Sequence, residues 1–249
     1  MRLSFNIAYD GSNYSGWQVQ PNCRTVQEVI EQAFKTILRY AIPITGCGRT
    51  DAGVHASDYY FHCDVEDDSV IIDKIVYQLN SVLPNDISIK NVSVVNLDWS
   101  ARYSALTRSY EYFFHTEHNP FIRDYSFYYP KLKELACTDI DAYCDFITNQ
   151  REFKTLCKSK SGVNHYRCII YSAEFRELGN HRYVFKIKAN RFLRGMIRLM
   201  VGAMLNVARG KLSMNDLKLA FDNQQSLPIN WSVPGHGLFL SRVTYPEIK

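Results

Sequence analysis

The residues best suited to chemistry lie together in one short, glycine-rich segment. Residues 46–56 read GCGRTDAGVHA and contain three glycines, one arginine, one aspartate and one histidine. Glycine adopts backbone angles that other residues avoid, so this segment can bring the Asp51 carboxylate close to a ligand. Such a carboxylate can act as a nucleophile or a base. The alternative is that Asp51 only accepts hydrogen bonds from its own loop. The glycine spacing matches neither the P-loop nor the dinucleotide-binding motif, so it gives nucleotide binding little support.

Arg198 is the second candidate, because it lies in a segment that is apolar nearly all round. Residues 192–207 surround it with Phe, Leu, Met, Ile and Val, and a helix of that composition is mostly buried. A buried guanidinium requires an anionic partner, which a carboxylate or a phosphate would supply. Alternatively, the long side chain reaches solvent. This helix alone does not choose between the two.

The segment RSYEYFF, residues 108–114, is an aromatic-rich strand. Tyr110 and Tyr112 share one face of it, and Glu111 lies on the other. Taken alone, the pattern favours tyrosines packed in a core, and a role for Tyr110 in a functional site stays open.

Basic residues are concentrated in one region of the chain. Residues 151–211 contain 14 lysines and arginines against 3 acids, whereas the rest of the chain contains 15 against 22. This asymmetry indicates a polyanionic partner for the basic region. Aromatic residues interleave with these charges, as in His165-Tyr166-Arg167 and Arg191-Phe192, and single-stranded RNA is recognised by such residues. The alternative is a solvated basic surface without a ligand.

The elements that must position these residues alternate between strands and helices. The patterns predict an α+β fold with helices on one face of largely antiparallel sheets. A seam near residues 119–130 divides it into an N-terminal half, 1–120, which carries the Asp51 loop, and a C-terminal half, 121–249, which carries the basic region. Strands are predicted at 3–9, near 44, and at 59–63, 87–97, 105–115, 166–175, 183–189 and 237–244. Helices are predicted after a capping box at 25–28, at 71–82, 132–148 and 193–208, and from 213.

The overall composition indicates a cytoplasmic protein. The 7 cysteines are odd in number and irregularly spaced, which favours reduced thiols over disulfides. The sequence has no apolar run long enough to span a membrane, and its first residues lack the apolar core of a signal peptide.

Several of these segments together resemble the tRNA pseudouridine synthase A family, nearly from end to end. The most specific is GRTDAGVHA within residues 46–56. The others are Tyr9-Asp10-Gly11 with Gly16-Trp17-Gln18, Arg24-Thr25-Val26-Gln27-Glu28, Arg108-Ser109-Tyr110, Asn190-Arg191-Phe192-Leu193 through Met196-Ile197-Arg198, and the closing residues 234–240.

The resemblance implies a fold, an activity and a partner. The fold would be the pseudouridine-synthase fold, in which two ferredoxin-like halves form a central cleft. The activity would be isomerisation of uridine to pseudouridine at positions 38, 39 and 40, in the tRNA anticodon stem-loop. The resemblance further implies a homodimer that uses no cofactor and no metal.

The resemblance also assigns roles to individual residues. Asp51 matches the catalytic aspartate, Tyr110 the active-site tyrosine, and Arg198 the arginine that pairs with the aspartate. Arg49 matches an arginine implicated in flipping the target nucleotide. Further candidates for contacting RNA are His55, Arg108, Arg191 and Arg194. Since an adjacent arginine keeps a carboxylate ionised in a dry pocket, we expect Asp51 and Arg198 to form a buried ion pair.

Three rival functions deserve comparison. A zinc-dependent base deaminase requires H-x-E followed by P-C-x-x-C; His115-Thr116-Glu117 supplies the first part, but no later cysteines have that spacing. Cys47 as a nucleophile has no histidine in its loop before His55. The remaining alternative is a catalytically inactive RNA-binding protein of the same fold. The presence together of Asp51, Tyr110 and Arg198 argues against it.

Overall fold

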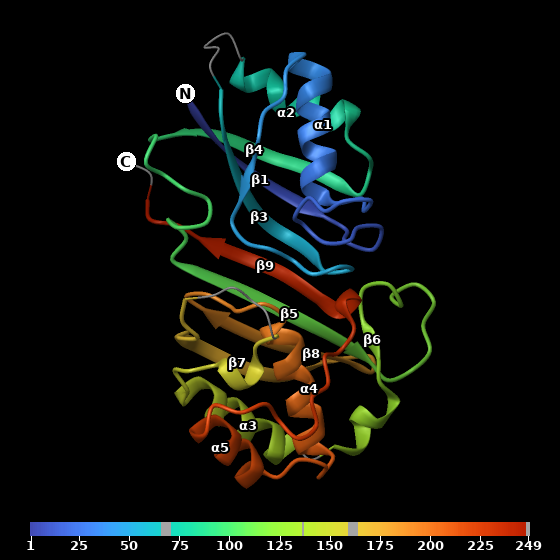
Figure 1. Cartoon of the computed structure of the whole chain (residues 1–249). Coiled ribbons are helices and arrows are strands. Elements are labelled where there is room, and N and C mark those ends of the chain that lie inside the picture. The colour runs from blue at the N-terminus through green and yellow to red at the C-terminus, as the bar shows by residue number, and fades with distance from the viewer. Residues whose placement is uncertain (66–70, 136, 159–163, 248–249) are drawn as a thin grey trace. The chain divides into compact units, whose positions relative to one another are not determined.

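The computed structural model describes residues 1–65, 71–135, 137–158 and 164–247, in two compact units (Figure 1). The first unit comprises Met1–Arg108 with Phe239–Lys249, and the second comprises Ser109–Leu238. The predicted boundary between residues 120 and 121 stays a prediction. In either division Asp51 falls in the first part and Arg198 in the second.

The first unit is a sheet with two helices. The central strand β1 (Arg2–Tyr9) pairs antiparallel with β3 (His55–Asp64) and with β4 (Ile87–Val95). The short strand β2 (Thr45–Gly46) also pairs with β3, and the C-terminal strand β9 (Leu238–Thr244) lies parallel to β3. Helices α1 (Val26–Leu38) and α2 (Ile72–Val82) contact each other and pack on this sheet (Figure 1).

The local sequence explains where these elements begin and end. The Thr25 hydroxyl accepts a hydrogen bond from the Glu28 N–H at 3.4 Å, which caps α1 at the predicted position. Behind the cap, Phe34 of α1 meets Phe5 of β1 edge to face at 5.4 Å, and Phe5 stacks on Phe61 of β3 at 4.9 Å. Burial of these three rings holds α1 on the sheet.

The second unit is also a sheet with helices. Its strands are β5 (Thr107–His115), β8 (Arg182–Ala189) and β7 (Ile170–Gly179), in that spatial order, with the short β6 (Phe127–Tyr128) parallel to β5. Strands β7 and β8 are antiparallel. Helix α3 (Cys137–Asn149) packs on β7 and on α4 (Met196–Ala208), and α5 (Met214–Asp222) follows (Figure 1). Short 3₁₀ turns cover Pro130–Glu134, Lys154–Leu156 and Gly235–Gly237.

The mixed α+β architecture with mostly antiparallel pairing confirms the predicted fold class. The largest differences between the predicted and the observed bounds concern three elements. Strand β3 begins at His55, so the end of the glycine-rich segment is already strand. The helix predicted at 132–148 divides into a 3₁₀ turn that ends at Glu134 and α3, which starts at Cys137. The strand predicted at 166–175 extends instead over Ile170–Gly179, because it continues into a tight turn with β8.

Helix α4 is buried on almost every side, as its composition predicts. From Met196 to Val207 every residue except Arg198 is buried, including Asn206. Among the described residues, no helix is both long enough and apolar enough to cross a membrane.

Candidate active site

The loop that carries Asp51 is fixed by backbone hydrogen bonds to a second loop, residues 10–18, in the same unit. The Trp17 N–H donates to the Thr50 carbonyl at 3.2 Å, and the Gly53 N–H donates to the Tyr14 carbonyl at 3.3 Å. These bonds lie on either side of Asp51. Its main chain is therefore held at both ends while its side chain is only half buried.

Aromatic residues support the same loop from within the unit. Trp17 stacks on Tyr59 with ring centroids 4.1 Å apart, and both rings are buried. The Tyr59 hydroxyl donates to the Gly48 carbonyl at 2.6 Å, and the hydroxyls of Tyr9 and Thr50 lie 2.8 Å apart. Buried polar contacts of this kind specify one loop conformation. Asp51 therefore lies on a preorganised support, not on a mobile segment.

Glycine permits the close approach of the two loops. A side-chain carbon at Gly11 would lie 2.1 Å from the Val54 carbonyl oxygen, a distance that no larger residue could occupy. The motif glycine at position 11 is thus explained by packing against the segment that follows Asp51.

Arg49 lies at the surface of this loop. Its side chain is exposed, and its Nε donates to the Gln18 side-chain oxygen at 3.2 Å. An exposed guanidinium two residues before Asp51 is accessible to a substrate. Its role in nucleotide flipping stays a prediction.

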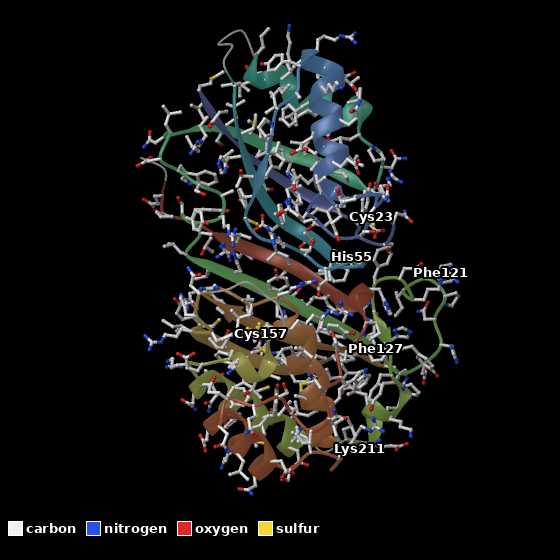
Figure 2. The ribbon with its side chains drawn as sticks, viewed as in Figure 1. Cys23, His55, Phe121, Phe127, Cys157 and Lys211 are labelled. Atoms are coloured by element: carbon white, nitrogen blue, oxygen red, sulfur yellow. The ribbon has the colours of Figure 1, made fainter. Side chains whose placement is uncertain are left out.

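His55 is buried at the start of β3, with 1% of the residue exposed (Figure 2). Its ring stacks on Phe239 at 4.5 Å. Its Nδ1 lies 3.1 Å from the Gly11 nitrogen and 3.0 Å from Asp10 Oδ1. One nitrogen cannot accept from Gly11 and donate to Asp10 at once. We assign Nδ1 as the acceptor of the buried Gly11 N–H, because an unpaired buried N–H is costly. This geometry supports a structural role, and the RNA contact stays a prediction.

Cys47 is poorly suited to act as a nucleophile. Burial raises the pKa of its thiol to about 12, so the reactive thiolate is disfavoured. Its backbone ties Arg108 into the first unit: Arg108 Nη2 donates to the carbonyls of Cys47 at 2.9 Å and Arg102 at 2.7 Å. The RNA-contacting role of Arg108 stays a prediction beside this structural one.

Arg198 is the half-buried exception on α4, and the backbone of a distant segment holds it. Its Nε donates to the Val233 carbonyl at 2.6 Å, and the Val233 N–H donates back to the Arg198 carbonyl at 3.2 Å. The predicted ion pair with Asp51 stays a prediction, since the two residues belong to different units. Sequence reasoning missed Val233, because a carbonyl acceptor leaves no signature in side-chain types.

Tyr110 and Tyr112 share a strand face but differ in their surroundings. Tyr112 is fully buried, and its hydroxyl donates to the Pro234 carbonyl at 2.9 Å. Tyr110 is half buried and meets Phe192 edge to face at 5.2 Å. The core interpretation therefore applies to Tyr112. The active-site role of Tyr110 stays a prediction.

The basic region combines paired and exposed cations. Ion pairs join Arg167 to Glu152, Arg176 to Glu174 and Lys186 to Glu111, at 2.8, 2.6 and 2.9 Å. Arg191 Nη1 lies 3.1 Å from His165 Nε2. Arg194 is exposed, and its carbonyl accepts a hydrogen bond from the Lys158 N–H at 3.1 Å.

The described residues contain no group of three or more His, Cys, Asp or Glu side chains arranged to hold a metal ion.

Fold and site together define an α+β protein with a carboxylate on a rigid glycine-rich loop and a basic second unit. Comparison with known proteins identifies the family. A model described as tRNA pseudouridine synthase matches residues 6–104 and 150–246. The chain belongs to the tRNA pseudouridine synthase family. The matched segments include Asp51 and Arg198, whereas Tyr110 lies between them.

Individual relatives match almost the whole chain. Proteins named tRNA pseudouridine synthase A from Bacteroides fragilis and Bacteroides thetaiotaomicron are 38% and 40% identical to it, over 99% of this chain and 97% and 91% of the relatives. A protein of the same name from Exiguobacterium sibiricum is 35% identical, over 100% of this chain and 98% of its own.

Proposed function

We propose that this chain isomerises uridine to pseudouridine in tRNA, at positions 38–40 of the anticodon stem-loop. The observation that carries the proposal is the family match, which spans both Asp51 and Arg198. Relatives named tRNA pseudouridine synthase A, matched over nearly full length, support the same activity. A homodimer in the cytoplasm, with no cofactor, completes the proposal.

The reaction breaks the C1′–N1 glycosidic bond, rotates the uracil and joins its C5 to the ribose. Asp51 attacks either the sugar carbon or the base, or it first removes a proton from the ribose. All three routes need an ionised carboxylate, and Arg198 beside it would keep it so. The Asp51 loop, whose main chain is held at both ends, supports this role, because a preorganised charge requires no rearrangement during the reaction.

The target base must leave its stack, at a cost of a few kcal/mol. Arg49, exposed near Asp51, would fill the vacated space or hold the displaced phosphate. Tyr110 would stack beneath the uracil, and its hydroxyl would help to remove the C5 proton. The arginines at 191 and 194 would contact the phosphates of the stem.

Release of tritium from tRNA transcripts labelled at uracil C5 tests the proposal. The wild type should release label from one or more of positions 38, 39 and 40, and transcripts with cytidine at each position identify which. Asp51→Asn should abolish release and leave tRNA binding nearly unchanged. Asp98→Asn, which removes a charge from an exposed residue of the same unit, is the control.

Turnover by Asp51→Asn would contradict the assignment of the catalytic residue. Binding of tRNA by the wild type without any release of label would instead favour the alternative, an RNA-binding protein of this fold that lacks activity.

A further inference from the structure

Residues 231–237 form a segment, here called the strap, that runs between α4 and β5 of the second unit. At its first end, Gly202 of α4 lies against Trp231, where a side-chain carbon on the glycine would come within 1.8 Å of the Trp231 carbonyl oxygen. At its other end, the same carbon on Gly237 would lie 2.9 Å from the Phe113 carbonyl oxygen and 3.0 Å from the Tyr112 ring. The strap is therefore in close contact with both elements.

Two successive carbonyls of the strap accept hydrogen bonds from two side chains. The Val233 carbonyl takes the Nε–H of Arg198 at 2.6 Å, and the Pro234 carbonyl takes the hydroxyl of Tyr112 at 2.9 Å. Val233 and Tyr112 are both 0% exposed, so one partner of each bond is shielded from water. Because the acceptors are adjacent in the chain, the position of one carbonyl constrains the other.

The bond at Nε fixes how Arg198 can meet an anion. A guanidinium has five N–H donors, one on Nε and four on the terminal nitrogens. With Nε directed at Val233, a carboxylate can be met only through the terminal nitrogens. The strap thus constrains the plane and direction of the guanidinium.

We propose that Tyr112 is a positioning residue for the reaction: its hydroxyl holds the strap, and the strap fixes the orientation of the Arg198 guanidinium. The catalytic consequence rests on the proposed function, whereas the effect on Arg198 does not. Burial raises the pKa of Tyr112 above its usual value, so the hydroxyl stays protonated and able to donate. Loss of this bond removes the hydrogen bond that joins the strap to β5, and the Val233 carbonyl then holds Arg198 Nε less rigidly.

The chain offers a closely matched control in Tyr143. This residue of α3 is also 0% exposed, lies in the same unit and donates its hydroxyl to a backbone carbonyl, that of Met200 on α4, at 2.8 Å. The Tyr143 hydroxyl is bonded to the helix that carries Arg198 and not to a carbonyl of the strap. Tyr112→Phe and Tyr143→Phe therefore each remove one hydrogen bond from a tyrosine to a backbone carbonyl, and only the bond of Tyr112 is made to the segment that holds the Arg198 side chain.

The test measures catalysis and the arginine separately. Tyr112→Phe should lower kcat about tenfold and change KM for tRNA less than about twofold, since a misdirected charge weakens the transition state without weakening RNA binding. Tyr143→Phe should lower the melting temperature about as much as Tyr112→Phe does, and it should leave kcat near that of the wild type. In ¹⁵N spectra, with the Arg198 Nε–H signal assigned by Arg198→Lys, hydrogen exchange at Nε should accelerate in Tyr112→Phe only.

Equal effects of the two variants on kcat and on Nε exchange would overturn the proposal. Accelerated exchange in Tyr112→Phe with no isomerase activity in the wild type would instead uphold the positioning of Arg198 and reject the proposed function. If Tyr112→Phe fails to fold, Pro234→Gly provides a second test of the proposal. It retains the hydroxyl and the carbonyl but loosens the strap, and should also accelerate Nε exchange; unchanged exchange would contradict the proposal.

Discussion

Gly16 lies against the carbonyl group of Thr50, the residue that immediately precedes Asp51. A side-chain carbon at Gly16 would lie 2.4 Å from the Thr50 carbonyl oxygen, and the φ angle of Gly16 is +94°. Both the contact and the backbone angle exclude other residues at this position. The orientation of the Asp51 loop therefore depends on a residue that is far from it in the sequence and has no side chain.

Gly16→Ala should displace the loop and lower kcat for tRNA by at least about tenfold, with a loss of about 2 kcal/mol or more in the free energy of unfolding. Gly48→Ala is the control for packing, because a side-chain carbon there meets nothing within 4 Å. Its free energy of unfolding should change by less than about 1 kcal/mol. Urea unfolding and tritium release give the two quantities. An active, fully stable Gly16→Ala would show that the loop tolerates the displacement.

His55 should act on stability and not on phosphate binding. His55→Leu removes the acceptor of the Gly11 N–H and should lower the free energy of unfolding by about 1–3 kcal/mol. His55→Asn offers an acceptor again and should recover part of the loss. The slope of log Kd for tRNA against log salt should stay that of the wild type in both. A slope lower by about 1 would instead show that His55 contacts a phosphate.

The free energy of unfolding should fall as the pH drops below 6.5. Burial, then the neighbouring His236 and His118, hold the pKa of His115 below its usual value of 6.5, so the unfolded chain takes up a proton that the folded chain resists. His115→Gln should flatten the dependence between pH 7.5 and 5. The exposed His181 provides the control His181→Gln. Burial also lowers the pKa of His62 in the first unit, so some dependence should persist; an unchanged slope in His115→Gln would refute the assignment.

Local sequence signals predicted the helices and strands, but they did not predict backbone contacts between residues distant in the sequence. Thr25 as a helix cap needs only residues nearby, and α1 begins where expected. Arg198 was predicted to need an anion. The structure adds a backbone acceptor, the Val233 carbonyl 35 residues away, which no pattern of side-chain types predicts. Tyr110 and Tyr112 look equivalent in an alternating strand. The strap packs against Tyr112, which is a buried donor, whereas Tyr110 is half buried.

The basic region should bind tRNA through its exposed cations. Substitutions at two arginines distinguish a direct phosphate contact from an effect of the region's net charge. Arg194 is exposed beside the start of α4, whereas Arg176 is exposed but paired with Glu174 at 2.6 Å. Arg194→Gln should weaken tRNA binding and lower the slope of log Kd against log salt by about 1, because one phosphate contact and its counterion release are lost. Arg176→Gln removes the same formal charge, but a cation already neutralised by a carboxylate contributes little to phosphate binding, so both quantities should stay close to the wild type. Equal losses in the two variants would mean that tRNA responds to the overall charge of the region and not to a contact at Arg194.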